Sequence, residues 1–176
     1  MSTQFFSFSD DTPFSTEAVL VNASSSHYEE DWPSIPHTHA FTELFYVSEG
    51  SGEFLIENQH FSIKKDDLII VNPHIQHTES FLSASPLSYY TVGVDGISFS
   101  FHDQKEFQIF HCRQKHADLL FYFHSLFQEL DEKNDGYEEI CKHTLAILIS
   151  QLRRFAVSDF QLFPSFHPSK ECALVK

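Results

Sequence analysis

The chain has 176 residues, 41% of them hydrophobic, which favours one domain with a substantial core, or one domain with an appendage. The chain has 11 Lys and Arg residues and 25 Asp and Glu residues. The resulting formal net charge of −14 argues against direct binding of nucleic acid or of an anionic membrane surface. Cys112, Cys141 and Cys172 follow no metal or disulfide spacing, and neither a signal peptide nor an apolar run of about 18 residues is present, so we expect a cytoplasmic protein.

The chain begins with polar residues that precede the first predicted strand. Residues 1–15 are rich in Ser and Thr and carry four phenylalanines, so we interpret them as an arm with apolar anchors. A frayed terminus is the alternative. Residues 17–22 predict a first strand, and residues 23–36, mostly polar with two prolines, predict a connection.

Residues 36–50, PHTHAFTELFYVSEG, hold most of the candidate functional side chains. His37 and His39 lie two apart, so on a strand they would point to the same face. Glu43 shares their parity, but a straight strand would carry it about 13 Å beyond His39 at about 3.3 Å per residue. If the three side chains converge, the chain must therefore turn or bulge at residues 40–42.

The strand that follows Glu43 would line an enclosed space with alternate side chains. Phe45 and Val47 share the parity of Glu43 and are expected to point inward, whereas Tyr46 is expected to point outward. Trp32, just upstream of the two histidines, would form a wall at the mouth of the pocket. The predicted ligand-binding residues are thus His37, His39, Glu43, Phe45, His77 and Trp32.

Short strands continue to residue 94, and two of them flank a second polar segment. Residues 64–67 form a turn, a buried strand follows, Asn72-Pro73 ends it, and His77 opens the next strand. The predicted strands are residues 43–48, 52–57, 60–63, 68–71, 77–82 and 89–94, with 106–111 as a last one. Strands this short with turn residues between them predict a sandwich or a barrel.

Three imidazoles and one carboxylate make a plausible set of metal ligands. Imidazole suits divalent transition metals and carboxylate can complete such a site, so His37, His39, Glu43 and His77 would hold Zn, Ni, Fe or Mn. The same groups can instead hydrogen-bond the hydroxyls of an organic effector without an essential metal. Purely structural histidines are the third alternative.

Beyond residue 112 the hydrophobic pattern changes to a helical period. Residues 115–133 predict one amphipathic helix and residues 136–155 predict a second, joined by a short turn. The second helix has two apolar stripes, one of them containing Leu145, Ile149 and Leu152. We expect that stripe to pack against a second subunit in a homodimer through residues 136–156. A helix packed on both sides within one subunit is the alternative.

The motif H-x-H-x3-E, six residues and Gly50, followed by a Pro-containing turn and His77, resembles the two motifs of the cupin β-barrels. With the Asn72-Pro73 break, the run from about residue 30 to 82 most resembles the effector-binding domain of AraC-type bacterial transcription regulators. Three positions where glycine is usual in the family carry Asp31, Asp66 and His74. Asp tolerates the left-handed conformation, so the turn at Asp66 can be retained.

The resemblance implies a mainly β fold, a cupin-like barrel (double-stranded β-helix or jelly roll) followed by two antiparallel C-terminal helices. The arm at residues 1–15 would cover the effector pocket, residues 16–112 would form the barrel, and residues 113–157 the helical dimerisation hairpin. Residues 158–176, with two prolines, would be a linker to a DNA-binding domain that this sequence lacks. DNA would be bound only through the helix-turn-helix motifs of that domain.

The function that the resemblance implies is effector sensing and dimerisation for a transcription regulator, with a small molecule in the barrel and a sugar as one candidate. No nucleophile–base pair and no phosphate-binding glycine loop is visible, so we expect a protein that is not an enzyme. The alternative is a metal-dependent cupin enzyme, either a dioxygenase or a sugar isomerase.

Overall fold

The computed structural model describes residues 18–28, 35–81, 86–111, 117–155 and 160–164. The predicted arm, Trp32 and most of the predicted linker lie outside these residues. The elements are β1 (Val19–Tyr28), β2 (Thr42–Glu49), β3 (Ser51–Ile56), β4 (Gln59–Lys64), β5 (Asp67–Val71), β6 (His77–Phe81), β7 (Leu87–Asp95), β8 (Ile97–Phe101), β9 (Phe107–His111), α1 (Ala117–Glu132), α2 (Tyr137–Phe155) and β10 (Phe160–Pro164).

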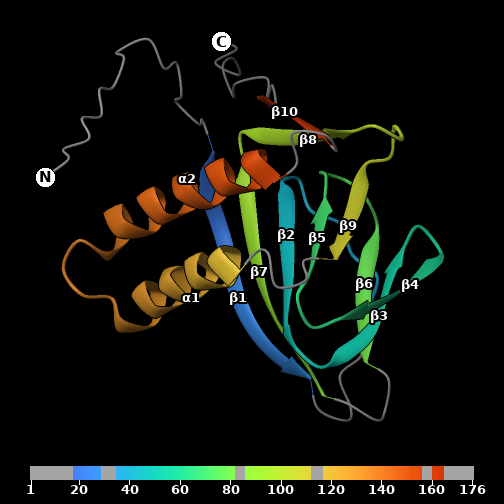
Figure 1. Cartoon of the computed structure of the whole chain (residues 1–176), viewed down its shortest axis with the longest axis horizontal. Helices are drawn as coiled ribbons and strands as arrows, with labels where there is room; N and C mark the ends of the chain where they lie inside the picture. The colour runs from blue at the N-terminus through green and yellow to red at the C-terminus, as the bar shows by residue number, and fades with distance from the viewer. Residues whose placement is uncertain (1–17, 29–34, 82–85, 112–116, 156–159, 165–176) are drawn as a thin grey trace, which may run out of the picture.

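The strands form an antiparallel, cupin-like arrangement of sheets, as the sequence predicts. A five-stranded sheet has the order β1-β7-β2-β5-β9, a three-stranded sheet has the order β4-β3-β6, and β8 pairs with β10. Figure 1 shows the three-stranded sheet on one side of the five-stranded sheet and the two helices on the other. The five-stranded sheet is therefore covered on both faces, which explains the continuous apolar character of β2 and β5.

The alternation of side chains along β2 separates two hydrophobic cores. Phe45 and Val47 lie in the core between the two sheets, together with Phe54 of β3. Leu44 and Tyr46 lie in the core beneath the helices. The predicted directions of these side chains are confirmed, although Tyr46 is buried under α1 and not exposed to solvent.

The two helices pack on the outer face of the five-stranded sheet. Phe123 of α1 stacks on Tyr46 with ring centroids 5.2 Å apart. The stripe of Leu145, Ile149 and Leu152 was expected to face a second subunit, but all three residues are buried within this subunit. That prediction is wrong because this stripe packs into the core beneath the helices, together with residues of α1 and of the five-stranded sheet. In the described chain, neither helix is long and apolar enough for a membrane crossing.

Three strand assignments differ from the sequence prediction. β1 continues through the serine-rich residues 23–28, which were assigned to a connection, and it pairs with β7 at the edge of the sheet. An edge strand with polar side chains lacks the apolar alternation that predicts a strand. β8 was missed, and β10 lies in the segment that was assigned to a linker; the two pair with each other from Phe160↔Phe101 to Pro164↔Ile97.

The residues at two turns, Asp66 and Gly50, suit the left-handed backbone conformation that they adopt. Asp66 has a φ of 68°, so it adopts the left-handed conformation predicted for it between β4 and β5. Gly50 has a φ of 78°, and a Cβ atom there would lie 1.7 Å from the carbonyl oxygen of Pro86. This close approach of two backbones explains the glycine that closes the first motif.

Candidate functional site

The chain bends between His39 and β2, as the convergence of the motif requires. Ala40 and Phe41 form the bend, and β2 begins at Thr42. The bend returns Glu43 toward His39, with 3.6 Å between Glu43 Oε1 and His39 Nε2. The acidic and imidazole groups predicted to converge therefore lie side by side.

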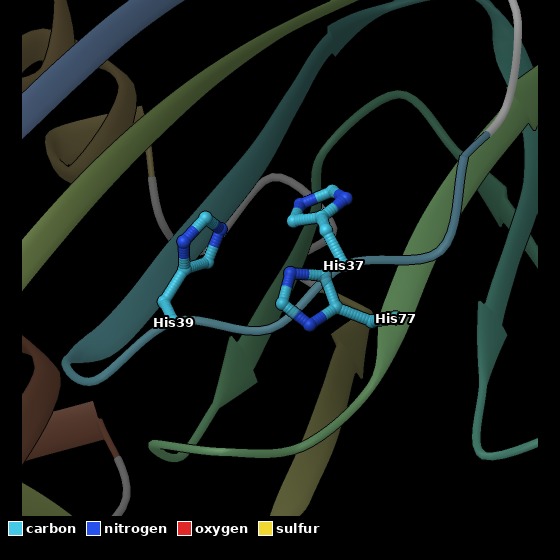
Figure 2. Close-up of side chains that lie close together, drawn as sticks. All are labelled: His37, His39 and His77. Carbon is cyan, nitrogen blue, oxygen red and sulfur yellow. The ribbon is translucent and has the colours of Figure 1, made fainter.

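His37 and His77 come from distant segments that are joined by backbone hydrogen bonds. The amide of each residue donates to the carbonyl of the other, with both N···O distances 3.0 Å. The segment at His37 thereby continues the three-stranded sheet beyond β6. Figure 2 shows His37, His39 and His77 projecting from these segments toward one another. One nitrogen of each imidazole lies within 4.8 Å of the others.

His77 is the most buried member of this cluster, with 2% of its side chain exposed. Its Nδ1 lies 2.9 Å from the carbonyl oxygen of Ile75, and its Nε2 lies 2.9 Å from Glu43 Oε2. Burial disfavours the imidazolium, but the hydrogen bond to Glu43 and the charge of that carboxylate outweigh burial and raise the pKa of His77. In the metal-free protein a proton on Nε2 is therefore well stabilised.

His39 has the opposite electrostatic balance. Burial and the neighbouring imidazoles of His37 and His77 lower the pKa of His39, and Glu43 offsets only part of this shift. Phe41 stacks on the His39 ring with centroids 4.6 Å apart. A Cβ atom on Gly93 would lie 2.6 Å from Phe41 Cε2, so the absence of a side chain at Gly93 leaves room for this stack.

His74 supports the cluster through its backbone. It adopts a φ of 69°, in the left-handed region, at a position where the resembled motif often has glycine. Its amide donates to the carbonyl of His39 over 2.7 Å, while its side chain is exposed. The geometry of the turn is thus retained without glycine, and His74 is not one of the clustered imidazoles.

The donor set fits a divalent transition metal. Nδ1 of His77 and Nδ1 of His37 each lie within hydrogen-bond distance of a backbone carbonyl, that of Ile75 and that of Ile35 respectively. A hydrogen bond of this kind fixes the tautomer and leaves Nε2 as the coordinating nitrogen. His39 and Glu43 lie beside them, so three nitrogens and a carboxylate oxygen could surround one ion.

Further polar groups inside the barrel were missed by the sequence analysis. Glu79 of β6 accepts hydrogen bonds from the hydroxyls of Tyr28 and Tyr89. Glu79 lies two residues after His77 and therefore has its parity, a signal that could have identified it. Tyr28 had no such signal, because its segment was assigned to a connection. The predicted residue Phe45 does lie inside the barrel, stacked on Tyr89.

Comparisons with solved structures place the fold among known proteins. Apo ToxT from Vibrio cholerae is similar over 84% of this chain and 60% of that chain, with 11% identity and a TM-score of 0.52. A cupin protein from Bacteroides fragilis covers 52% of this chain and 82% of its own, with 19% identity and a TM-score of 0.39. KdgF from a Halomonas species covers 43% and 77%, with 18% identity and a TM-score of 0.36.

Comparisons at the sequence level give a narrower result. The search of curated protein sequences gave no match. The family model described as the AraC-like ligand binding domain matches residues 24–148, well over half of the chain. The matched range includes the histidine cluster, Glu43 and both helices up to the last turns of α2. This chain therefore belongs to the family of AraC-like ligand-binding domains.

Proposed function

We propose that this chain is the effector-sensing and dimerisation part of a bacterial AraC-type transcription regulator. The observation that carries the proposal is the convergence of His37, His39, His77 and Glu43 within a barrel whose other sheet face supports two helices. Because the chain matches 60% of the length of ToxT, DNA binding by a further domain belongs to the proposal as well.

The binding centre would be the histidine cluster with Glu43. The four side chains would hold a divalent transition metal, which would act as a Lewis acid toward an oxygen or nitrogen of the effector. Without the metal, the same groups can donate and accept hydrogen bonds, which suits a sugar as one class of effector. In both cases the effector would bind against the histidine cluster.

The strands of the barrel would transmit effector binding to the helices. On β2, Phe45 faces inward and Tyr46 outward; on β7, Tyr89 faces inward and Tyr90 outward. Tyr46 stacks on Phe123 of α1, and Tyr90 stacks on Phe127 of α1 at 4.6 Å. An effector that shifts the inward rings would therefore shift the outward rings on which α1 packs, and would favour one helix position over another.

A second connection leads from the site to the C-terminal strand. The hydroxyl of Thr42, next to Glu43, donates to the carbonyl of Ile97 at the start of β8 over 2.8 Å. Ile97 pairs with Pro164 of β10. Because a DNA-binding domain would follow β10 in the chain, this contact would couple the site to the position of that domain.

The dimer would use the remaining apolar surface of α2. Ile140 and Ile147 are seven residues apart, share one helix face and are exposed. Light scattering at micromolar concentration is expected to give the mass of a dimer, and Ile147→Asp is expected to give the mass of a monomer. A monomeric wild-type chain would contradict this part of the proposal.

A metal-dependent cupin enzyme is the second candidate, because three imidazoles and a carboxylate are also a catalytic donor set. The encoding reading frame separates the two candidates. The proposal predicts that it continues past Lys176 into a basic segment with helix-turn-helix motifs. A stop codon directly after Lys176 would favour the enzyme and would contradict the regulator.

A further inference from the structure

Glu79 links the two sheets across the inside of the barrel. It pairs with Phe54 of β3, whose side chain lies in the core between the sheets, so Glu79 points to the same side. Its Oε1 accepts from the hydroxyl of Tyr28 at 3.1 Å and from that of Tyr89 at 2.5 Å. These tyrosines come from β1 and β7 of the opposite sheet.

The two tyrosines act as fixed donors to this carboxylate. Only 3% of Tyr28 and 5% of Tyr89 is exposed. Burial, followed by the charge of Glu79, raises the pKa of both phenols far above their usual value, so both hydroxyls keep their protons. Among the described residues none hydrogen-bonds Oε2 of Glu79, and the side chain is only half-buried. One oxygen is thus held in place and the other is available to a ligand.

A series of aromatic rings in contact with one another connects this carboxylate to the histidine cluster. Tyr89 stacks on Phe45 with centroids 4.2 Å apart, and Phe45 contacts Phe54 edge to face at 4.9 Å. Phe54 in turn stacks on His77 at 5.8 Å. The rings themselves are buried against one another, and the half-buried Glu79 lies at the edge of this aromatic cluster. A carboxylate at such an edge suits an organic cation, because aromatic rings also attract positive charge.

The distribution of charged side chains in the barrel also favours a cationic ligand. Every Lys and Arg side chain within the described ranges is exposed, so none of them faces the interior to bind an anion. The charge of Glu43 is matched by His77, or by a metal in its place. Glu79 has phenol donors, and its charge favours the protonated forms of His77 and His39 through space, but no described cation forms an ion pair with it. An anionic ligand would be repelled, and a neutral one would leave this carboxylate without a cation in contact.

We propose that Glu79, positioned by Tyr28 and Tyr89, determines the specificity of the effector site, and that the effector is an organic amine bound as its ammonium ion. The ammonium group lies against Glu79 Oε2 at the edge of the aromatic cluster, and the rest of the molecule extends toward the histidine cluster. This inference rests on the proposed function and narrows it from small molecules, sugars included, to amines.

Two matched series of compounds test the charge preference on the chain as it stands. The first is 2-phenylethylamine, 2-phenylethanol and phenylacetate, and the second is glucosamine, glucose and gluconate. In thermal-shift and calorimetric titrations, the amine of at least one series is expected to bind, with a shift in Tm of about 5–10 °C at 100 times its Kd. The matched alcohol, neutral sugar and acids are expected to give no comparable shift.

A pair of Glu→Gln variants assigns the preference to one side chain. Glu79→Gln keeps an oxygen that can accept from both tyrosines but removes the charge, so amine affinity is expected to fall about 10- to 100-fold. Glu53→Gln is the matched control, because Glu53 lies on β3 of the same sheet, opposite Ser80 and outside the described interior cluster. Its amine affinity is expected to match that of wild type.

Several outcomes would overturn the inference. These are tighter binding of a neutral or acidic member than of its amine, no binding of either amine, or an equal loss of affinity in both variants. If glucose binds and Glu79→Gln leaves its affinity unchanged, effector binding in the barrel stands and only the amine inference fails. If Glu79→Gln does not fold, the comparison of compounds on the wild-type chain still decides whether the site prefers an amine.

Discussion

The packing of α1 on the barrel can be tested by truncating Phe123. This residue is 0% exposed and stacks on Tyr46 at 5.2 Å and on Tyr90 at 6.3 Å, so it contacts β2 and β7 at once. The proposed transmission from the barrel interior to the helices passes through these contacts. We expect Phe123→Ala to destabilise the protein strongly and to uncouple α1 from the sheet.

The magnitude follows from complete burial. Replacing a buried Phe by Ala typically costs about 3–5 kcal/mol, through lost burial and the cavity that remains. For a chain of this length each kcal/mol lowers Tm by about 2–4 °C, so the expected decrease is about 6–20 °C. Phe121→Ala is the matched control on the same helix, because Phe121 is 64% exposed and its truncation should change stability by about 0.5 kcal/mol or less.

The assay is urea and thermal unfolding of both variants beside wild type, followed by circular dichroism. Both substitutions give alanine in a helix, so the difference between them isolates the packing against the barrel. Similar destabilisation in the two variants would refute the position of α1 on the sheet. It would also remove the basis for the proposed transmission through Tyr46 and Tyr90.

Three further predictions concern the site itself. Gly93→Ala should displace Phe41 from the ring beside it and weaken Zn²⁺ binding about tenfold or more, as removal of supporting contacts commonly does; unchanged affinity by calorimetry would argue against this support. Because Glu43 raises the pKa of His77, a metal must displace a proton below that pKa, so Zn²⁺ affinity should fall as the pH drops below it, by up to about tenfold per pH unit; a profile that stays flat down to about pH 5 would exclude His77 as a ligand. Thr42→Val leaves a buried carbonyl on β8 unpaired and should cost about 1–3 kcal/mol and speed hydrogen exchange in β10, whereas Thr42→Ser should not.

The fold and much of the candidate site could be predicted from local patterns. The parity of His37 and His39, and the distance to Glu43 along a straight strand, required a bend at residues 40–42, and the bend is present. The left-handed turn at Asp66 followed from the tolerance of Asp for that conformation. These features depend on residues close together in the sequence.

Features that depend on distant segments could not be predicted in the same way. Tyr28 reaches Glu79 because β1 pairs with β7 across the whole length of a polar edge strand, and polar serines carry no strand signal. The buried stripe of α2 was assigned to a partner subunit because an apolar helix face does not specify what covers it. Leu145 lies in the core of this subunit, and only the three-dimensional structure shows that this core, and not a partner subunit, covers the stripe.

The most direct test of the central claim is metal binding by protein purified without an affinity tag. Wild-type protein titrated with Zn²⁺ in a calorimeter is expected to bind about one ion per chain. The His37→Ala/His39→Ala double variant is expected to lose this binding, and the exposed His60→Ala is expected to keep it. Equal Zn²⁺ binding by wild type and the double variant would contradict the assignment of the histidine cluster as the binding centre of this domain.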